Sequence, residues 1–132
     1  MTQPYHRTTE VWNAKAASQT LTYLGADPNF PVENFGQIKL SLQLTTFSGT
    51  VDFQSSADNV NWFSIPYFRA DNLVALVTGL LNAPSEFVLV DGGRVYVVPG
   101  GPWPYFRVVM TWSDGAIARG VLQGYEHDSG FV

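Results

Sequence analysis

The side chains with the clearest potential for chemistry lie in one polar stretch, Asp58-Asn59-Val60-Asn61. Carboxylate and amide oxygens are the ligands that calcium prefers, so Asp58, Asn59 and Asn61 could supply a cation site. The same side chains also form turns, because they accept hydrogen bonds from the backbone a few residues further on. The chain must reverse direction here, so we interpret these residues as turn formers rather than as metal ligands.

The two histidines do not form a recognisable metal or catalytic site. His127 lies between Glu126 and Asp128, but consecutive residues on a strand point to opposite faces, and His6 is near the other end of the chain. The sequence has no Gly-x-Ser-x-Gly motif for a nucleophile and no cysteine for a thiolate, a disulfide or a zinc site. We therefore predict no bound metal and no cofactor.

Two of the acidic residues could in principle form the carboxylate pair that glycosidases use for catalysis. No motif selects two of them, and the Asp91-Gly92-Gly93 stretch leads into a strand rather than into a phosphate-binding helix N-terminus. We predict that the protein is not an enzyme and has no catalytic residues. The carboxylates considered are Asp52, Glu86, Asp91 and Asp114.

Aromatic residues suggest a different function, because planar rings on a β-sandwich stack on sugars in carbohydrate-binding modules. Trp103 is the best candidate, since Pro102 and Pro104 could hold its ring out on a loop. Trp and Tyr are also typical of cores and subunit interfaces, and we favour that interpretation. The candidates for interface or ligand contact are Trp103, Tyr105, Tyr67, Phe68 and Trp12.

Length and composition favour a single domain with a weakly charged surface. The chain has 132 residues, of which 45% are hydrophobic and 14% charged, and its net charge is −4. A charged fraction well below the roughly 25% of average soluble domains suits a protein that lies against another protein. A monomer is the alternative, since exposed apolar residues are common on monomers. No run of Lys or Arg favours nucleic acid, and no segment reaches the ~18 apolar residues of a membrane span. We expect synthesis in the cytoplasm without targeting.

Alternating apolar residues predict the strands that carry these side chains. Residues 37–45 alternate, and Ser48-Gly49 is interpreted as a turn into a returning strand at 50–54. A second hairpin is predicted from residues 87–98, with its turn at Asp91-Gly92-Gly93.

A third alternating stretch runs from Tyr105 to Ser113, with Phe106, Val108, Met110 and Trp112 on one face. The Ser113-Asp114-Gly115 stretch then turns the chain into a strand at 116–125. Short strands separated by turn residues predict an all-β, single-domain antiparallel β-sandwich that is jelly-roll-like.

The remaining segments are less regular. We predict a weak strand near residues 21–24, a proline-containing loop or arm at 26–36, and either a short helix or an extra strand near 71–81. The resulting division has three parts. Residues 1–36 contain an extended N-terminal arm, the first strand and the loop, packed on or extending from the same domain. Residues 37–126 form the sandwich, and residues 127–132 form a C-terminal tail.

The order of features from residue 48 to about 125 resembles a small β-sandwich module of tailed-bacteriophage virion proteins, which include capsid decoration (cement) and tail-associated proteins. In that module the turn before the Trp carries Asp-Gly, whereas this chain has Asp58-Asn59, which tolerates positive φ less freely. The matching features are Gly49 to Phe53, Ser56, Asp58, Trp62, Gly93, Tyr96 to Gly100, Tyr105 to Val108, and Gly115.

The resemblance implies a non-enzymatic structural protein of a phage virion. We favour a decoration protein on the outer surface of the head, bound to the major capsid protein or other virion proteins, as a trimer or dimer. The alternatives are a tail, baseplate or fibre-adaptor protein, or a carbohydrate-binding module for host glycans. In this interpretation the N-terminal arm and the 26–36 segment reach neighbouring subunits, and Trp62 is a core or interface anchor.

Overall fold

One antiparallel sheet holds all the strands of the part of the chain that the structure describes, residues 6–17, 19–24, 30–70 and 85–126. In this computed structural model the strand order is β1-β7-β3-β6-β5, with β2 paired to β7 and β4 to β3. The elements are β1 (His6–Lys15), β2 (Gln19–Leu24), the 3₁₀ turn η1 (Val32–Asn34), β3 (Phe35–Ser56), β4 (Phe63–Ser64), β5 (Phe68–Arg69), β6 (Ser85–Pro99) and β7 (Tyr105–Glu126).

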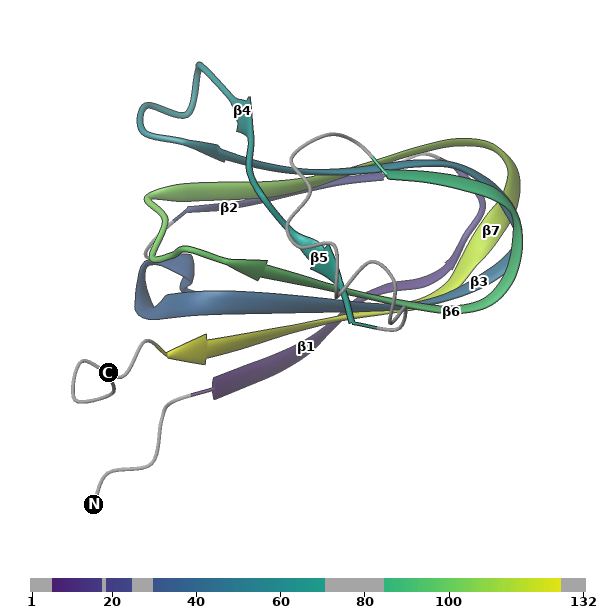
Figure 1. Cartoon of the computed structure of the whole chain (residues 1–132), viewed down its shortest axis with the longest axis horizontal. Helices are drawn as coiled ribbons and strands as arrows, with labels where there is room; N and C mark the ends of the chain where they lie inside the picture. Colours follow the sequence, from purple (N-terminus) through teal and green to yellow (C-terminus); the bar gives the residue numbers. More distant parts are fainter. Residues whose placement is uncertain (1–5, 18, 25–29, 71–84, 127–132) are drawn as a thin grey trace.

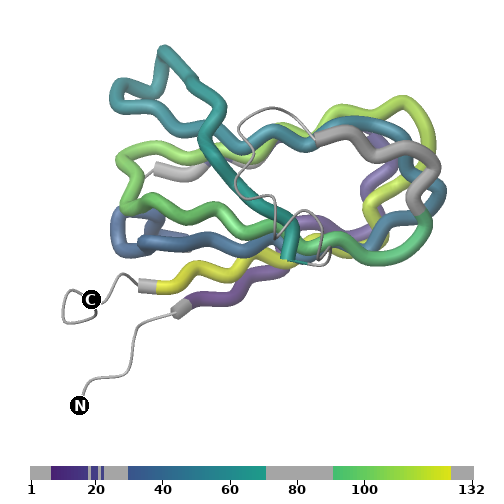
Figure 2. The backbone as a smooth tube through the Cα atoms, viewed as in Figure 1, coloured from purple at the N-terminus to yellow at the C-terminus, as the bar shows by residue number. Residues whose placement is uncertain are grey.

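The sheet folds over on itself at one end, which we call the corner (Figures 1 and 2). Strands β3, β6 and β7 each continue through the corner, so each of these three strands belongs to both layers. Leu40 pairs with Leu122 in one layer, and Val51 pairs with Met110 in the other. The prediction of an all-β antiparallel sandwich is confirmed, although its two layers come from one bent sheet rather than from two separate sheets.

The predicted hairpin turns are wrong, because all three are bends within long strands. Ser48-Gly49 lies inside β3, Asp91-Gly92-Gly93 inside β6, and Ser113-Asp114-Gly115 inside β7. Register shifts mark each bend, and Thr46 and Gly115 have positive φ values of 43° and 85°. Gly, Ser and Asp permit a β-bulge as readily as a turn, which is why the local sequence does not distinguish the two.

A bulge at the corner also changes which residues of β3 face inward. Before the bend the buried residues have even numbers, from Ile38 to Leu44, and after it they have odd numbers, from Phe47 to Phe53. One extra residue inverts the alternation, because successive side chains in a strand point to opposite faces. The bulge therefore keeps the apolar face of β3 toward the interior in both layers.

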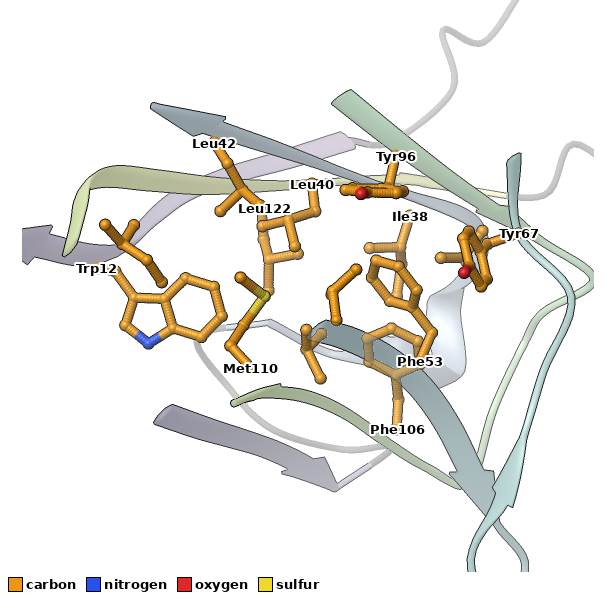
Figure 3. Packing of buried hydrophobic residues seen from close by; sticks show 14 of the residues in the cluster. Trp12, Ile38, Leu40, Leu42, Phe53, Tyr67, Tyr96, Phe106, Met110 and Leu122 are labelled. Carbon is orange, nitrogen blue, oxygen red and sulfur yellow. The ribbon is translucent and has the colours of Figure 1, made fainter. Parts of the chain in front are cut away.

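The core fills the space between the two layers (Figure 3). The alternation predicted for the start of β7 is confirmed, since Phe106, Val108, Met110 and Trp112 are all buried. Near the end away from the corner, Phe53, Tyr67 and Tyr96 pack together with ring centroids 5.1–5.6 Å apart.

The N-terminal region is part of the sheet rather than an extended arm. β1 pairs along its length with the second half of β7, and Trp12 is only 1% exposed. The weak strand predicted near residues 21–24 is confirmed as β2, which pairs with the first half of β7. Residues 1–5 lie outside the described part of the chain.

The segment predicted as an arm at 26–36 also packs inward over the residues that the structure describes. Phe30, Val32 and Phe35 are fully buried, and the backbone N–H of Gly101 donates to the carbonyl of Gly36 at 3.0 Å. Residues 30–36 therefore close the core of their own chain. Residues 25–29, the 71–81 segment and the 127–132 tail fall wholly or largely outside the described residues. Among the described residues, no helix has the length and hydropathy of a membrane span.

Candidate functional site: the open end of the sandwich

A loop and a groove lie at the end of the sandwich opposite the corner, which we call the open end. The loop, residues 57–62, connects β3 to β4 and extends beyond the layers (Figure 1). β4 is held to β3 by the pairs Gln54–Ser64 and Ser55–Phe63, and the N–H of Ile65 donates to the carbonyl of Phe53 at 2.9 Å. The base of the loop is therefore fixed on the sheet.

Two side chains organise the loop from within. The Ser56 hydroxyl, on a residue only 4% exposed, accepts hydrogen bonds from the backbone N–H groups of Asp58 and Asn59 and donates to Asp58 Oδ1 at 3.0 Å. Asp58 Oδ1 accepts from the N–H groups of Val60 and Asn61 at 2.9 and 2.8 Å, and Oδ2 accepts from Asn61 Nδ2. Asn59 has a φ of 61°.

These contacts confirm that Asp58 and its neighbours are turn formers. Both Asp58 oxygens are engaged inside the loop, where they accept hydrogen bonds from the backbone and from the Asn61 side chain. Within the described part of the chain, no three His, Asp or Glu residues are grouped in a way that could hold a metal ion.

The hydrogen bonds to Asp58 lower the pKa of its carboxyl group well below the usual value. The backbone N–H of Asn61 has the largest effect, followed by the N–H of Val60 and by the side chains of Asn61 and Ser56. Each donor favours the charged carboxylate over the protonated acid. The charge of Asp58 therefore belongs to the structure of the loop.

We expect the loop to stay intact in acid that protonates an ordinary aspartate. A carboxyl with a lowered folded-state pKa stabilises the fold fully above its unfolded pKa, about 3.9, and loses this effect only as the pH falls through the folded value. Carboxyl ¹³C shifts measured by NMR should show no titration of Asp58 between about pH 3 and 5, whereas the urea-unfolded chain titrates there. Titration of Asp58 near pH 4 in the folded protein would contradict this assignment.

The outer face of the sheet holds the other side of the loop through a chain of polar contacts. The Arg107 guanidinium lies 4.2 Å from the ring centroid of Trp62, and its Nε donates to Gln54 Oε1. Gln54 Nε2 donates to Asp52 Oδ2 at 2.6 Å, and Ser64 Oγ donates to Asp52 Oδ1 at 2.8 Å. Trp62 is half-buried against this outer face, so its interpretation as a core residue is wrong.

The result is an ordered loop region that exposes two apolar side chains. Val60 is 75% exposed and Phe63 68% exposed, and they are the exposed large hydrophobic residues of the described chain. We call this pair the knob. A loop fixed by hydrogen bonds presents such side chains with little ordering left to do on binding, which favours a contact role.

A groove of about 520 Å³ lies at the open end beside the loop. Its lining comes from the end of β3, the segment after β4 and the connection between β6 and β7, and it includes Ile65, Pro66, Pro99, Pro102, Trp103 and Pro104. None of its lining residues is charged, and the prolines offer no backbone N–H. The groove therefore suits an apolar occupant.

Three of the five aromatic candidates belong to the core. Trp12 and Tyr67 are 1% exposed and Trp103 is 5% exposed, so the favoured core interpretation is confirmed for them. The idea that prolines hold Trp103 out on a loop is wrong, because its ring packs on Phe106 with centroids 5.3 Å apart. Phe68 and Tyr105 are half-buried on β5 and β7.

The sequence prediction missed the knob. The sequence prediction places Val60 only within the polar turn stretch and does not single out Phe63, although an apolar residue inside residues 58–61 is an available signal. Of the carboxylates considered for a glycosidase, Asp52 belongs to the network that holds the loop, while Asp91 and Asp114 lie near the corner.

Comparison with known proteins shows the fold but not a sequence family. No protein-family model matches the chain, and no curated protein sequence matches it significantly. The crystal structure of the SPBc2 prophage-derived protein YomS is similar, with a TM-score of 0.69 over 96% of this chain and 97% of that chain, at 7% sequence identity. This chain therefore has the fold of a prophage-derived protein, over nearly the whole length of both.

Proposed function

We propose that this protein is a non-enzymatic structural protein of a bacteriophage particle. The observation that carries the proposal is the knob, two apolar side chains that an ordered loop keeps exposed at one end of the molecule. Exposed apolar groups on a fixed support are typical of protein contact surfaces. The shared fold with a prophage-derived protein supports a phage origin for this surface.

Within the particle, we favour a capsid decoration protein on the outer surface of the head. Such a protein adds buried contact area between neighbouring capsomers, and a surface with few charged groups suits that role. Its partners would be the major capsid protein or other virion proteins. A tail, baseplate or fibre-adaptor protein with the same fold is the alternative.

Copy number in purified particles tests this proposal and separates the two locations. We expect quantitative mass spectrometry to find the protein at a fixed high ratio to the major capsid protein, because decoration sites repeat over the head. A few copies per particle would favour the tail, and cryo-electron microscopy would locate them. Absence of the protein from purified particles would overturn the structural role.

The carbohydrate-binding alternative loses its main support in the structure. Of the two residues that would stack on sugar rings, Trp103 lies in the core, whereas Tyr105 is half-buried on β7. Loss of glycan binding in Trp103→Ala would therefore report a damaged core as readily as a lost sugar contact.

A further inference from the structure

We propose that two copies of this chain pair at their open ends, with the knob of each copy inserted in the groove of the other. The inference names the partner of the surface assigned above, and it rests on that surface being an assembly contact. It does not depend on where in the particle the protein lies.

The chemistry of the groove selects an apolar guest. Its walls carry Ile65, four prolines and the largely buried Trp103 beside Ser55 and Ser56, and none of its lining residues is charged. A charged or strongly polar guest would lose water there without gaining charged partners. Its volume of about 520 Å³ is enough for side chains of a partner.

The knob supplies a guest of that kind and does not fill the groove of its own chain. Phe63 precedes the groove residue Ile65 by two positions, yet its side chain remains 68% exposed. Pairing of β4 with the end of β3 holds Phe63 opposite Ser55. The knob is thus fixed where it can meet another molecule.

Symmetry makes the same surface complementary to itself. Because the knob and the groove lie at one end of one molecule, a two-fold axis that places the first knob in the second groove also makes the reciprocal contact. Two apolar contacts form for one loss of rotational and translational freedom.

Charge limits where two identical copies can meet. Each chain carries a net charge of −4, so two copies repel at long range, and contact through the groove, whose lining residues are uncharged, adds least to that repulsion. Asp58, the acidic residue of the loop, uses both carboxylate oxygens within the loop.

Two variants that damage opposite halves of the contact test the proposal. The first, Val60→Ser with Phe63→Ser, removes the knob, and the second, Ala57→Trp, fills the groove from an exposed lining position. Sedimentation velocity across a concentration series should show that the wild-type chain dimerises. We expect each variant to have a dimer Kd at least about tenfold higher, because each removes apolar contact from both halves of the interface. A tenfold change corresponds to about 1.4 kcal/mol of binding free energy.

An equimolar mixture of the two variants provides the decisive measurement. The knob of the groove-filled chain can enter the intact groove of the knob-free chain, so the mixture should form more dimer than either variant alone. Gln43→Ala, on an exposed strand position near the corner, is the matched control and should dimerise as the wild type does. Circular dichroism and urea unfolding of each variant check that the fold is kept.

The outcomes separate this inference from the proposed function. A wild-type chain that stays monomeric, variants that dimerise as tightly as the wild type, or a mixture with no gain would each overturn pairing through the knob. If the chain is monomeric but binds purified particles in a manner that depends on Phe63, the partner is another virion protein and the structural role stands. If it dimerises but is absent from particles, pairing stands and the virion role fails.

Discussion

Replacing Trp12 by alanine is expected to lower the free energy of unfolding by about 3–5 kcal/mol, the usual range for removal of a large buried aromatic side chain. Trp12 is 1% exposed and lies in β1, which pairs with β7. A Cβ added at Gly120 would lie 2.6 Å from the Trp12 ring, so the indole fills its site closely. Because the free energy of unfolding of domains of this size is about 5–15 kcal/mol, the variant loses a large part of its stability.

Urea unfolding followed by circular dichroism measures this effect, with Trp62→Ala as a control of the same residue type. Trp62 is half-buried on the outer face, so its loss should cost much less. Trp12→Phe should keep most of the stability, because Trp12 Nε1 has no hydrogen-bond partner among the described residues and the ring contributes through apolar burial. An effect of Trp12→Ala below about 1 kcal/mol would mean that β1 is not a structural strand.

The pairing of β1 with β7 affects how an N-terminal deletion should be interpreted. An arm that reaches a neighbouring subunit predicts that removal of residues 1–10 reduces occupancy on the particle. However, Arg7 to Glu10 pair with Val121 to Gly124 in β7, so this deletion also removes half of an edge strand. Reduced occupancy would then reflect a damaged sheet as readily as a lost contact, and the stability of the deleted chain must be measured first.

Local alternation was sufficient to predict the strands at 37–45 and 105–113 and their inward faces. Phe106 to Trp112 and Ile38 to Leu44 face the core as their spacing indicates, because a half-buried strand needs an apolar residue at every second position. The bends could not be predicted in the same way. Whether Ser48-Gly49 forms a hairpin or a bulge depends on Trp112 and Asp114, which pair there from more than 60 residues away.

At the candidate site, some features depend on the local sequence and others on packing between distant segments. The role of Asp58 followed from its own stretch of sequence, since a turn former bonds to residues two and three positions ahead. The exposure of Phe63 and the burial of Trp103 depend on how the loop, η1 and the start of β7 meet at the open end. No spacing within one segment carries that information.

Alanine substitutions at three glycines of the corner should distinguish steric crowding from backbone strain as the reason that glycine is needed in this bend. Gly49 has no positive φ but has close neighbours. A Cβ added there would lie 2.5 Å from Trp112 Cβ and closer still to the Thr111 carbonyl oxygen. Gly92 has a φ of +123° with no atom near an added Cβ, and Gly115 combines a φ of +85° with contact to the carbonyl oxygens of Thr45 and Thr46. The three positions thus differ in steric contact and in backbone strain.

We expect alanine to cost about 1–3 kcal/mol at Gly92 from backbone strain, and about 1–3 kcal/mol at Gly49 from crowding. At Gly115 both effects act, so the cost should exceed either single effect and approach their sum. The free energies of unfolding in urea provide the comparison, with Gly100→Ala as a second position of positive φ, +97°, and no close neighbour, outside the corner. If the corner were an ordinary flexible turn, the chain would relax around the added methyl group, and Gly115→Ala would cost no more than Gly92→Ala. A larger loss at Gly115 would instead show that the close approach of β7 to β3 holds the two layers in their bent arrangement.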